Sequence, residues 1–143
     1  MKEPQSVVQL PCVGSTLRRA ARAATRLYER ELRASGLRST QFTLLQALDF
    51  AGKITQGQLG SILSLDSTTL TRSLQALLGK GWVKEMRGED RRERYLELTP
   101  SGRRKLEHTW PAWQRAQNRV KKAIGRSWED LDADLRLITS LER

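Results

Sequence analysis

Apolar residues recur at helical spacing between Thr55 and Val83, and the pattern predicts two short helices joined by a tight connection. The apolar face of the first helix consists of Leu59, Ile62 and Leu63. The stripe of the second helix is longer and consists of Leu70, Leu74, Leu77 and Leu78. Between the two, Asp66 suits the N-cap of the second helix, because its carboxylate can accept hydrogen bonds from exposed backbone N–H groups. The stretch therefore predicts a helix-turn-helix.

The opposite side of the second helix is polar and carries a single charge. Its residues are Thr68, Thr69, Arg72 and Gln75. A face exposed only to water would usually hold Glu and Lys four residues apart. Short hydroxyls with one Arg instead suit a surface that lies close against base edges and phosphates. The alternative is an ordinary helical hairpin with an exposed Ser/Thr-rich side, and this stretch alone leaves both open.

Two helices are predicted before this pair. A long helix over about 15–35 has an alanine-rich apolar stripe lined by Arg residues, and Gly36 fits its end. Ser39 or Thr40 can cap the next helix, and Gly52 ends it. The apolar residues of that helix are Phe42, Leu45, Leu48 and Phe50. Thr55, after a possible one-bridge strand over 53–55, can cap the first helix of the helix-turn-helix.

A charged hairpin and two more helices are predicted after the pair. Segments 82–87 and 94–99 have strand character, and the turn between them is charged almost throughout. Thr99 suits the N-cap of a long helix over about 100–124, with Pro100 at its first position. Pro111 should kink or interrupt this helix. Ser127 suits the cap of a last helix to about Leu141.

Composition narrows the class of partner. A length of 143 residues indicates one domain, or one domain with helical extensions, and a hydrophobic content of 38% suffices for a modest core. The net charge of +10 favours a polyanion as partner. The single cysteine excludes a disulfide within the chain. No apolar run approaches a membrane span, and the first residues lack the features of a signal peptide, so we expect a cytoplasmic protein without a membrane partner.

The charge is unevenly distributed along the chain. Between Ser39 and Gly79 only four residues are charged, whereas residues 80–126 are rich in Arg and Lys and the last segment is acidic. The positive charge therefore flanks the helix pair. This distribution is expected where flanking elements contact phosphates and the helix pair contacts bases.

With this order of elements, residues from about 12 to 143 resemble the MarR family of bacterial transcriptional regulators. The most specific part is Asp90 and Arg92 followed by Leu-Thr-Pro-Ser-Gly over 98–102. The second part is Gln58-Leu59 ahead of the segment 65–72, and then Gly-Trp-Val over 81–83.

The resemblance implies a mainly α fold with a small β wing, a winged helix-turn-helix. It implies three parts: residues 1–38 and 100–143 would form a dimerisation region, and residues 39–99 the DNA-binding lobe. It also implies a homodimer on a pseudo-palindromic duplex and a repressor that a small molecule or an oxidant releases. Independently, the apolar stripes of the terminal segments exceed what one small domain needs, which favours pairing with a second copy. Those stripes are Val7, Val8 and Leu10 in the arm and Trp128, Leu131, Leu135 and Ile138 in the last helix.

The resemblance also assigns DNA-contacting residues. The groove-facing set is Ser67, Thr68, Thr69 and Arg72, with Thr71, Ser73 and Gln58 as candidate phosphate contacts. Arg72 could bond a guanine or a phosphate, and both remain open. On the wing, Arg92 would enter the minor groove and Asp90 would orient its guanidinium. Arg91 and Arg94 would add positive field.

The pattern that indicates effector-binding or redox-sensing residues is less specific than the pattern for DNA contacts. An aromatic and Arg cluster, where the first, second and fifth helices would meet, could hold a small aromatic or anionic effector such as an aromatic carboxylate. Its candidate residues are Arg18, Arg22, Tyr28, His108, Trp110 and Trp113. The alternative is that both tryptophans are core or dimer-seam residues and that the Arg side chains are solvated. His108 has no companions for a metal site. Cys12 is a redox candidate, against a plain thiol near the dimer interface.

Other classes of function remain open from the sequence. One is a basic architectural DNA-binding protein without an effector, and another is a winged helix that binds protein. An enzyme fits least, because no catalytic constellation and no Gly-rich phosphate loop can be named, and no cofactor is expected.

Overall fold

The structure is a computed structural model that describes residues 11–90 and 92–142. Its helices are α1 (Val13–Leu32), η1 (Arg33–Ser35), α2 (Ser39–Ala51), α3 (Gln56–Leu63), α4 (Ser67–Gly79), α5 (Pro100–Ala123), α6 (Trp128–Thr139) and η2 (Ser140–Glu142), where η marks a short 3₁₀ turn. Its strands are β1 (Ile54–Thr55), β2 (Val83–Arg87) and β3 (Arg94–Leu98). They form one antiparallel sheet in the order β1-β3-β2. No helix within the described ranges is long and apolar enough to cross a membrane.

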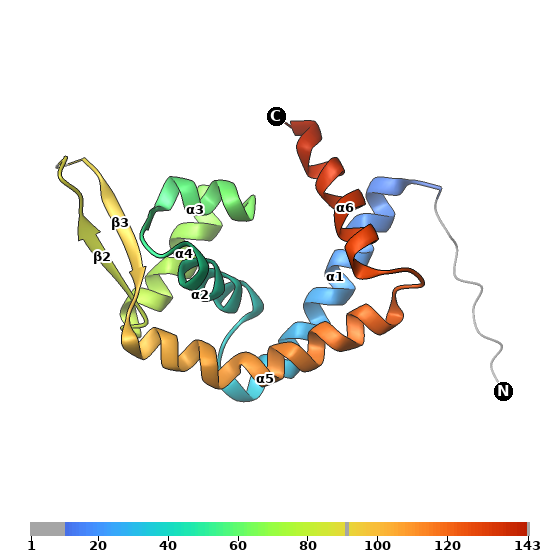
Figure 1. Cartoon of the computed structure of the whole chain (residues 1–143), viewed down its shortest axis with the longest axis horizontal. Helices are drawn as coiled ribbons and strands as arrows, with labels where there is room; N and C mark the ends of the chain where they lie inside the picture. Colours follow the sequence, from blue (N-terminus) through green and yellow to red (C-terminus); the bar gives the residue numbers. More distant parts are fainter. Residues whose placement is uncertain (1–10, 91, 143) are drawn as a thin grey trace.

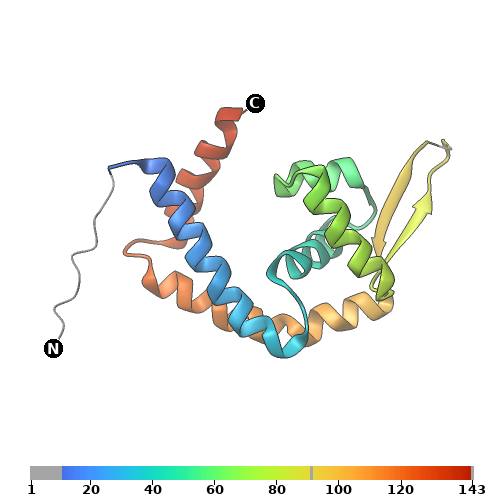
Figure 2. The same ribbon diagram turned by 180° about the vertical axis from the view of Figure 1, so that it is seen from behind.

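The elements form two groups that α5 joins (Figure 1). One group contains α2, α3, α4 and the β2–β3 hairpin, and the other contains α6 and the N-terminal part of α1. The view from behind shows α1 running along α5 towards the first group (Figure 2). The hairpin projects beyond α4 as a wing. The predicted winged helix-turn-helix architecture is therefore present, in the predicted element order.

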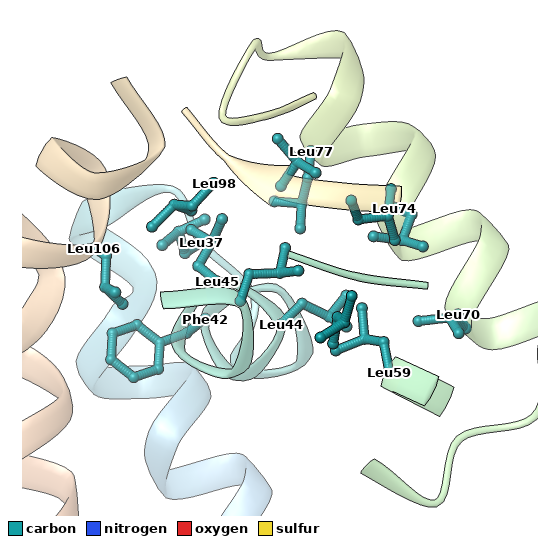
Figure 3. Close-up of a cluster of buried hydrophobic side chains, with 14 of the residues drawn as sticks. Leu37, Phe42, Leu44, Leu45, Leu59, Leu70, Leu74, Leu77, Leu98 and Leu106 are labelled. Carbon is teal, nitrogen blue, oxygen red and sulfur yellow. The ribbon is translucent and has the colours of Figure 1, made fainter. Parts of the chain in front are cut away.

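Leucines from α2, α3 and α4 form the core of the first group (Figure 3). On α4 the predicted stripe is confirmed, since Leu70, Leu74 and Leu77 are buried and Leu78 is half-buried. They pack with Leu44, Leu45, Leu48 and Leu59, which are also buried. Burying one such side chain contributes about 1.5–3 kcal/mol. This packing fixes which face of α4 points to solvent.

Two predicted core residues, Phe50 and Ile62, are exposed instead. On α2, Phe50 is 96% exposed, whereas Leu44, which was not in the predicted stripe, is fully buried. At about 100° per residue, Phe50 lies across the helix from Leu45 and Leu48. Ile62 is 61% exposed, because the packed side of the short helix α3 runs from Leu59 towards Leu63.

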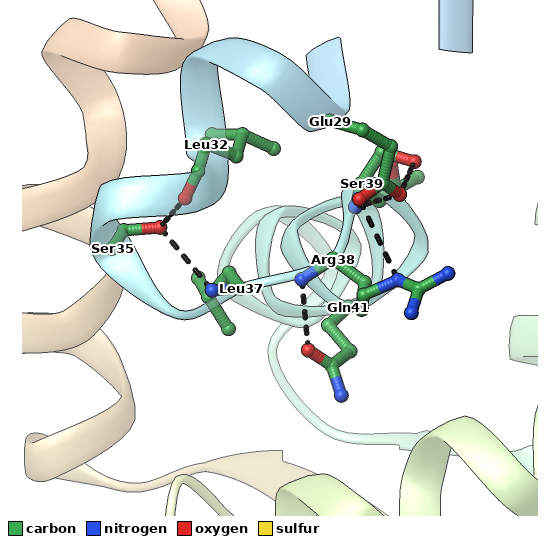
Figure 4. A network of polar contacts seen from close by, with 8 residues as sticks. Glu29, Leu32, Ser35, Leu37, Arg38, Ser39 and Gln41 are labelled. Carbon is green, nitrogen blue, oxygen red and sulfur yellow. Dashed lines mark hydrogen bonds and ion pairs between the residues drawn. The ribbon is translucent and has the colours of Figure 1, made fainter. Parts of the chain in front are cut away.

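A residue of α1 fixes the start of α2, and no Ser or Thr side chain serves as the N-cap of α2. The N-cap residue is Arg38, not Ser39 or Thr40 as predicted. Both the backbone N–H and the hydroxyl of Ser39 donate to Glu29 Oε1 of α1, at 2.9 and 2.8 Å, and Glu29 also pairs with Arg38 at 3.5 Å (Figure 4). The contact spans ten residues, and it ties the long helix to the helix-turn-helix lobe.

Most predicted helix ends are confirmed. The N-caps of α3, α4, α5 and α6 are Thr55, Asp66, Thr99 and Ser127, and each side chain accepts a hydrogen bond from the helix's first turn. Gly36 has the left-handed φ of 77° predicted for a helix end. The first helix ends earlier than predicted, at Leu32, and continues as a 3₁₀ turn. The long helix α5 is kinked rather than interrupted: it continues through Pro111, and its axis bends near its middle (Figure 1).

The junction between the wing and α5 depends on Thr99 and Gly102. The Thr99 hydroxyl donates to the Gly81 carbonyl at 2.6 Å and accepts from the Gly102 N–H at 3.0 Å, while the Thr99 N–H donates to the Trp82 carbonyl at 3.0 Å. A Cβ at position 102 would lie 2.0 Å from the Trp82 carbonyl oxygen. Only glycine lets the helix approach the base of the wing this closely.

Replacing Gly102 with alanine should therefore destabilise the fold. We expect Gly102→Ala to lower the free energy of unfolding by about 1–3 kcal/mol, because backbone must shift to admit the methyl group. Urea denaturation measures the change. The matched control is Gly79→Ala, since nothing lies within 4 Å of a Cβ there. Equal denaturation midpoints for Gly102→Ala and the wild type would contradict this account.

Candidate nucleic-acid interface

The N-terminus of α4 is fixed by Asp66. One carboxylate oxygen accepts from the Thr69 backbone N–H at 2.8 Å, and the other accepts from the Thr69 hydroxyl at 2.7 Å. These hydrogen bonds hold the pKa of Asp66 below its ordinary value. Thr69, a predicted groove-facing residue, is exposed, but its hydroxyl proton is already engaged.

A shallow depression of about 380 Å³ lies on the exposed face of α4. It is lined by Ser67, Thr68, Thr71, Arg72 and Gln75, all of which are exposed. Within the described ranges, the side chains of Arg72 and Gln75 have no hydrogen-bond or ion-pair partner. This face therefore offers free donors and acceptors on a rigid helix.

Two neighbouring predicted residues are placed differently. The hydroxyl of Thr71 lies in the depression but accepts from Gln56 Nε2 at 3.0 Å, so a residue of α3 supports it. Ser73 is half-buried at the side of α4 and does not line the depression.

Gln75 also belongs to this face, although no DNA-contacting role was predicted for it. It lies three residues after Arg72 and seven after Thr68, which is the spacing of one helical face. That spacing placed Gln75 on the polar side. The side-chain amide of Gln can form two hydrogen bonds to adenine, and this property could have identified Gln75 as a base-contacting residue.

Gln58 is largely committed to the start of α3. Its Oε1 accepts from the Thr55 N–H at 2.9 Å, and its own N–H donates to the Thr55 hydroxyl at 3.1 Å. This reciprocal pair is a capping box. The Gln58 backbone N–H is therefore engaged, and a phosphate contact from Gln58 would use its side-chain nitrogen.

The wing tip presents Arg92 from an ordered turn. Asp90 accepts from the backbone N–H of Arg92 at 3.2 Å, and the Glu93 N–H donates to the Asp90 carbonyl at 2.9 Å. Asp90 therefore shapes the turn. Among the residues that the structure describes, Asp90 forms no ion pair with the Arg92 guanidinium, and the orienting role expected for Asp90 stays a prediction. Arg92 is exposed, and Arg91 lies outside the described residues.

Arg94 contributes less free charge than expected. Its guanidinium pairs with Glu85 across the hairpin at 2.7 Å, and Lys84 pairs with Glu97 at 3.4 Å. The strands β2 and β3 are antiparallel, so these side chains meet on neighbouring positions. Arg94 thus braces the wing, whereas Arg92, among the described residues, is an exposed cation at the wing tip for which no ion pair is present.

The structure does not bring the predicted effector residues together at one site. Tyr28 and Trp113 line a cleft of about 460 Å³ between α1, α2 and α5. Trp110 packs on Trp113, with ring centroids 4.7 Å apart, and it remains 40% exposed. The remaining three, Arg18, Arg22 and His108, are exposed and do not line this cleft. A helix rises about 1.5 Å per residue, which puts Arg18 about 15 Å along α1 from Tyr28.

Cys12 lies at the start of α1. It is exposed, and its Sγ accepts from the Ser15 N–H at 3.4 Å as the N-cap of the helix. Its redox role stays a prediction.

The helix-turn-helix, the exposed face of α4 and the charged wing define a winged-helix DNA-binding protein. Residues 37–93 match the family model described as the MarR family. The chain is 33% identical to the uncharacterized HTH-type transcriptional regulator YwoH of Bacillus subtilis, over 64% of this chain and 66% of that protein, just under two thirds of its length. The chain belongs to the MarR family, whose members are transcription regulators and not enzymes.

Solved structures agree with this assignment. The M. tuberculosis transcriptional regulator MosR, in complex with DNA, superposes with a TM-score of 0.82 at 34% identity, covering 92% of this chain and 96% of that one. Bordetella bronchiseptica BpsR, whose DNA binding is regulated by 6-hydroxynicotinic acid, superposes with a TM-score of 0.78 at 22% identity, covering 92% and 94%. The second likeness concerns the fold alone. Together with the family assignment, the first identifies the chain as a DNA-binding transcription regulator.

The Asp66 cap predicts a specific pH dependence. Its pKa is lowered on folding, so its contribution to stability is present above the ordinary value of 3.8 and is lost as the pH falls through the lowered pKa. Asn also caps helices but does not titrate. We therefore expect the stability of the wild type relative to Asp66→Asn to fall between about pH 5 and pH 3. Urea denaturation across this range measures it, and a difference independent of pH would contradict it.

Proposed function

We propose that this regulator is a repressor that binds a pseudo-palindromic duplex as a homodimer and is released by a small molecule. The observation that carries the proposal is the exposed face of α4, where Arg72 and Gln75 have no side-chain partner among the described residues and a buried leucine stripe holds the helix rigidly. A regulator acting on chromosomal DNA would work in the cytoplasm. The boundaries 1–38, 39–99 and 100–143 remain our proposed division into dimerisation and DNA-binding parts.

The face of α4 suits the major groove. Arg can bond both acceptors of guanine, and Gln can bond adenine N6 and N7, so the pair can read two base positions. Ser67 and Thr68 at the exposed N-terminal turn suit bases or phosphates, and Thr71, held by Gln56, suits a phosphate. We propose that Arg72 and Gln75 determine most of the sequence preference.

The wing suits the adjacent minor groove. Arg92 projects from a turn that Asp90 orders, and a narrow minor groove attracts such a cation through its negative potential. Contacts of this kind depend on groove shape more than on base identity. The wing would therefore add affinity to every duplex.

A second copy would cover the apolar groove formed by α1, α5 and α6. The groove has a volume of about 390 Å³, and no residue of α6, which lies wholly within the described ranges, is buried. Its lining includes Ala20, Val120, Ile124, Leu131 and Leu135. An apolar surface continuous over three helices favours an isologous dimer, in which each copy covers the other.

Release by a small molecule is supported by the position of the cleft at Tyr28 and Trp113. It lies between the proposed dimerisation helices α1 and α5 and the lobe that carries α4. An occupant would alter the angle between these parts, and with it the spacing of the two copies of α4 on DNA. The BpsR structure shows that a protein of this fold has its DNA binding regulated by a small molecule.

Two alanine variants separate base reading from general affinity. Arg72→Ala should cost about 1–3 kcal/mol on a selected duplex and much less on random DNA, because it removes a base contact. Arg92→Ala should weaken binding to both by the same factor. Fluorescence anisotropy measures the affinities. The control is Lys122→Ala at the far end of α5, and equal losses on both duplexes for Arg72→Ala would count against base reading.

A charge placed in the apolar groove tests the dimer. Leu135→Glu should convert the protein to a monomer and reduce operator affinity strongly, because the carboxylate would be buried without a partner. The control is Ala133→Glu, on the exposed side of the same helix. Analytical ultracentrifugation reports the mass of each variant. A wild type that is monomeric at the concentrations where it binds its operator would refute the dimer.

A further inference from the structure

We infer that the cleft at Tyr28 and Trp113 selects an uncharged aromatic molecule that carries an amide or a similar hydrogen-bonding group, and discriminates against a carboxylate. This inference rests on the proposed release by a small molecule and specifies the class of that molecule. It replaces the aromatic carboxylate expected from the sequence, because the two Arg residues on which that expectation depended, Arg18 and Arg22, do not line the cleft.

The lining of the cleft carries no formal charge. Among the described residues that form it, none is Arg, Lys, His, Asp or Glu, and its volume of about 460 Å³ is within the usual range for small-molecule sites. Burial raises the pKa of the Tyr28 phenol, which is therefore neutral at physiological pH. An anion that entered the cleft would lose water and gain no opposite charge.

One wall of the cleft is aromatic. Phe42 and Trp113 line it and are stacked, with centroids 5.7 Å apart and an angle of 20° between their planes, and Trp110 packs on Trp113. Leu63 and Leu65, around the turn of the helix-turn-helix, form part of the lining. A flat aromatic occupant would therefore contact both the wall and the DNA-binding motif.

The hydroxyl donors of the cleft are already used within the protein. Thr25 donates to the Ala21 carbonyl at 2.9 Å, and Thr43 donates to the Ser39 carbonyl at 3.0 Å. The Tyr28 hydroxyl donates to the side-chain oxygen of Gln117. These three hydroxyls therefore have no proton to donate to a carboxylate, which can only accept.

The polar groups of the lining that can still form hydrogen bonds suit an amide ligand. Ser39 also donates its hydroxyl proton, to Glu29 at 2.8 Å, and Glu29 in turn pairs with Arg38. What remains is the hydroxyl of Thr40 and the side-chain amides of Gln46 and Gln117, which can both donate and accept. A neutral ligand with one donor and one acceptor matches this set.

The test compares two probes of nearly the same shape, 2-naphthamide and 2-naphthoate, by isothermal titration calorimetry on the full chain. We expect the amide to bind at least about tenfold more tightly, because the carboxylate would be buried without a cation. Gln46→Lys should reverse the preference by placing a cation in the lining. Gln114→Lys, which adds the same charge on an exposed residue outside the cleft, should leave it unchanged.

Equal or tighter binding of 2-naphthoate to the wild type would overturn the inference, and so would a wild type that does not bind 2-naphthamide at millimolar concentration. Unchanged selectivity in Gln46→Lys would also overturn it, because binding would then lie elsewhere. Release of operator DNA is measured separately. An amide that binds with the expected selectivity but leaves the DNA bound supports the inference and contradicts the proposed release.

Discussion

The packing of α4 on α2 and α3 is the interaction on which the rest of the structure depends. Leu70, Leu74 and Leu77 are buried against leucines of the other two helices, and this burial fixes the rotation of α4 about its own axis. Because the leucines face inward, Arg72 and Gln75 must face outward. A protein that reads base edges needs this rotation to be rigid, since contacts to bases tolerate little displacement.

The wing and the long helix are joined to this core by backbone rather than by side-chain packing alone. The Trp82 carbonyl receives the Thr99 N–H, and the absence of a side chain at Gly102 lets α5 approach the same carbonyl. At the other end, Glu29 of α1 holds the first residue of α2. The lobe that carries α4 is therefore attached at two points, and the cleft between α1, α2 and α5 lies beside the second of them.

Local signals in the sequence were sufficient for the fold. Helical periodicity placed the α4 stripe, and Asp66 and Thr99 were recognisable as caps because a cap is decided within one turn. Phe50 was assigned to the wrong face of its helix, and the other failures involve contacts between distant residues or very short helices. Ser39 does not cap its helix because Glu29 engages it, and Ile62 is exposed because only part of a two-turn helix meets the core.

The candidate site was predicted less completely for the same reason. Sequence could propose Arg72 and Arg92, which depend on a local face and a local turn. It could not show that Glu85 pairs with Arg94 across the hairpin, or that Arg18 and Arg22 are remote from the cleft at Trp113. Cross-strand pairs and helix rotation are properties of the assembled structure.

The central claim is that the exposed face of α4 reads DNA in two symmetric copies. Selection of bound duplexes from a random pool, repeated at low and high salt, tests it most directly. The account predicts an inverted repeat with half-site centres about one helical turn, 10–10.5 base pairs, apart. Recovery of no sequence preference, or of one asymmetric motif without two-fold character, would contradict it.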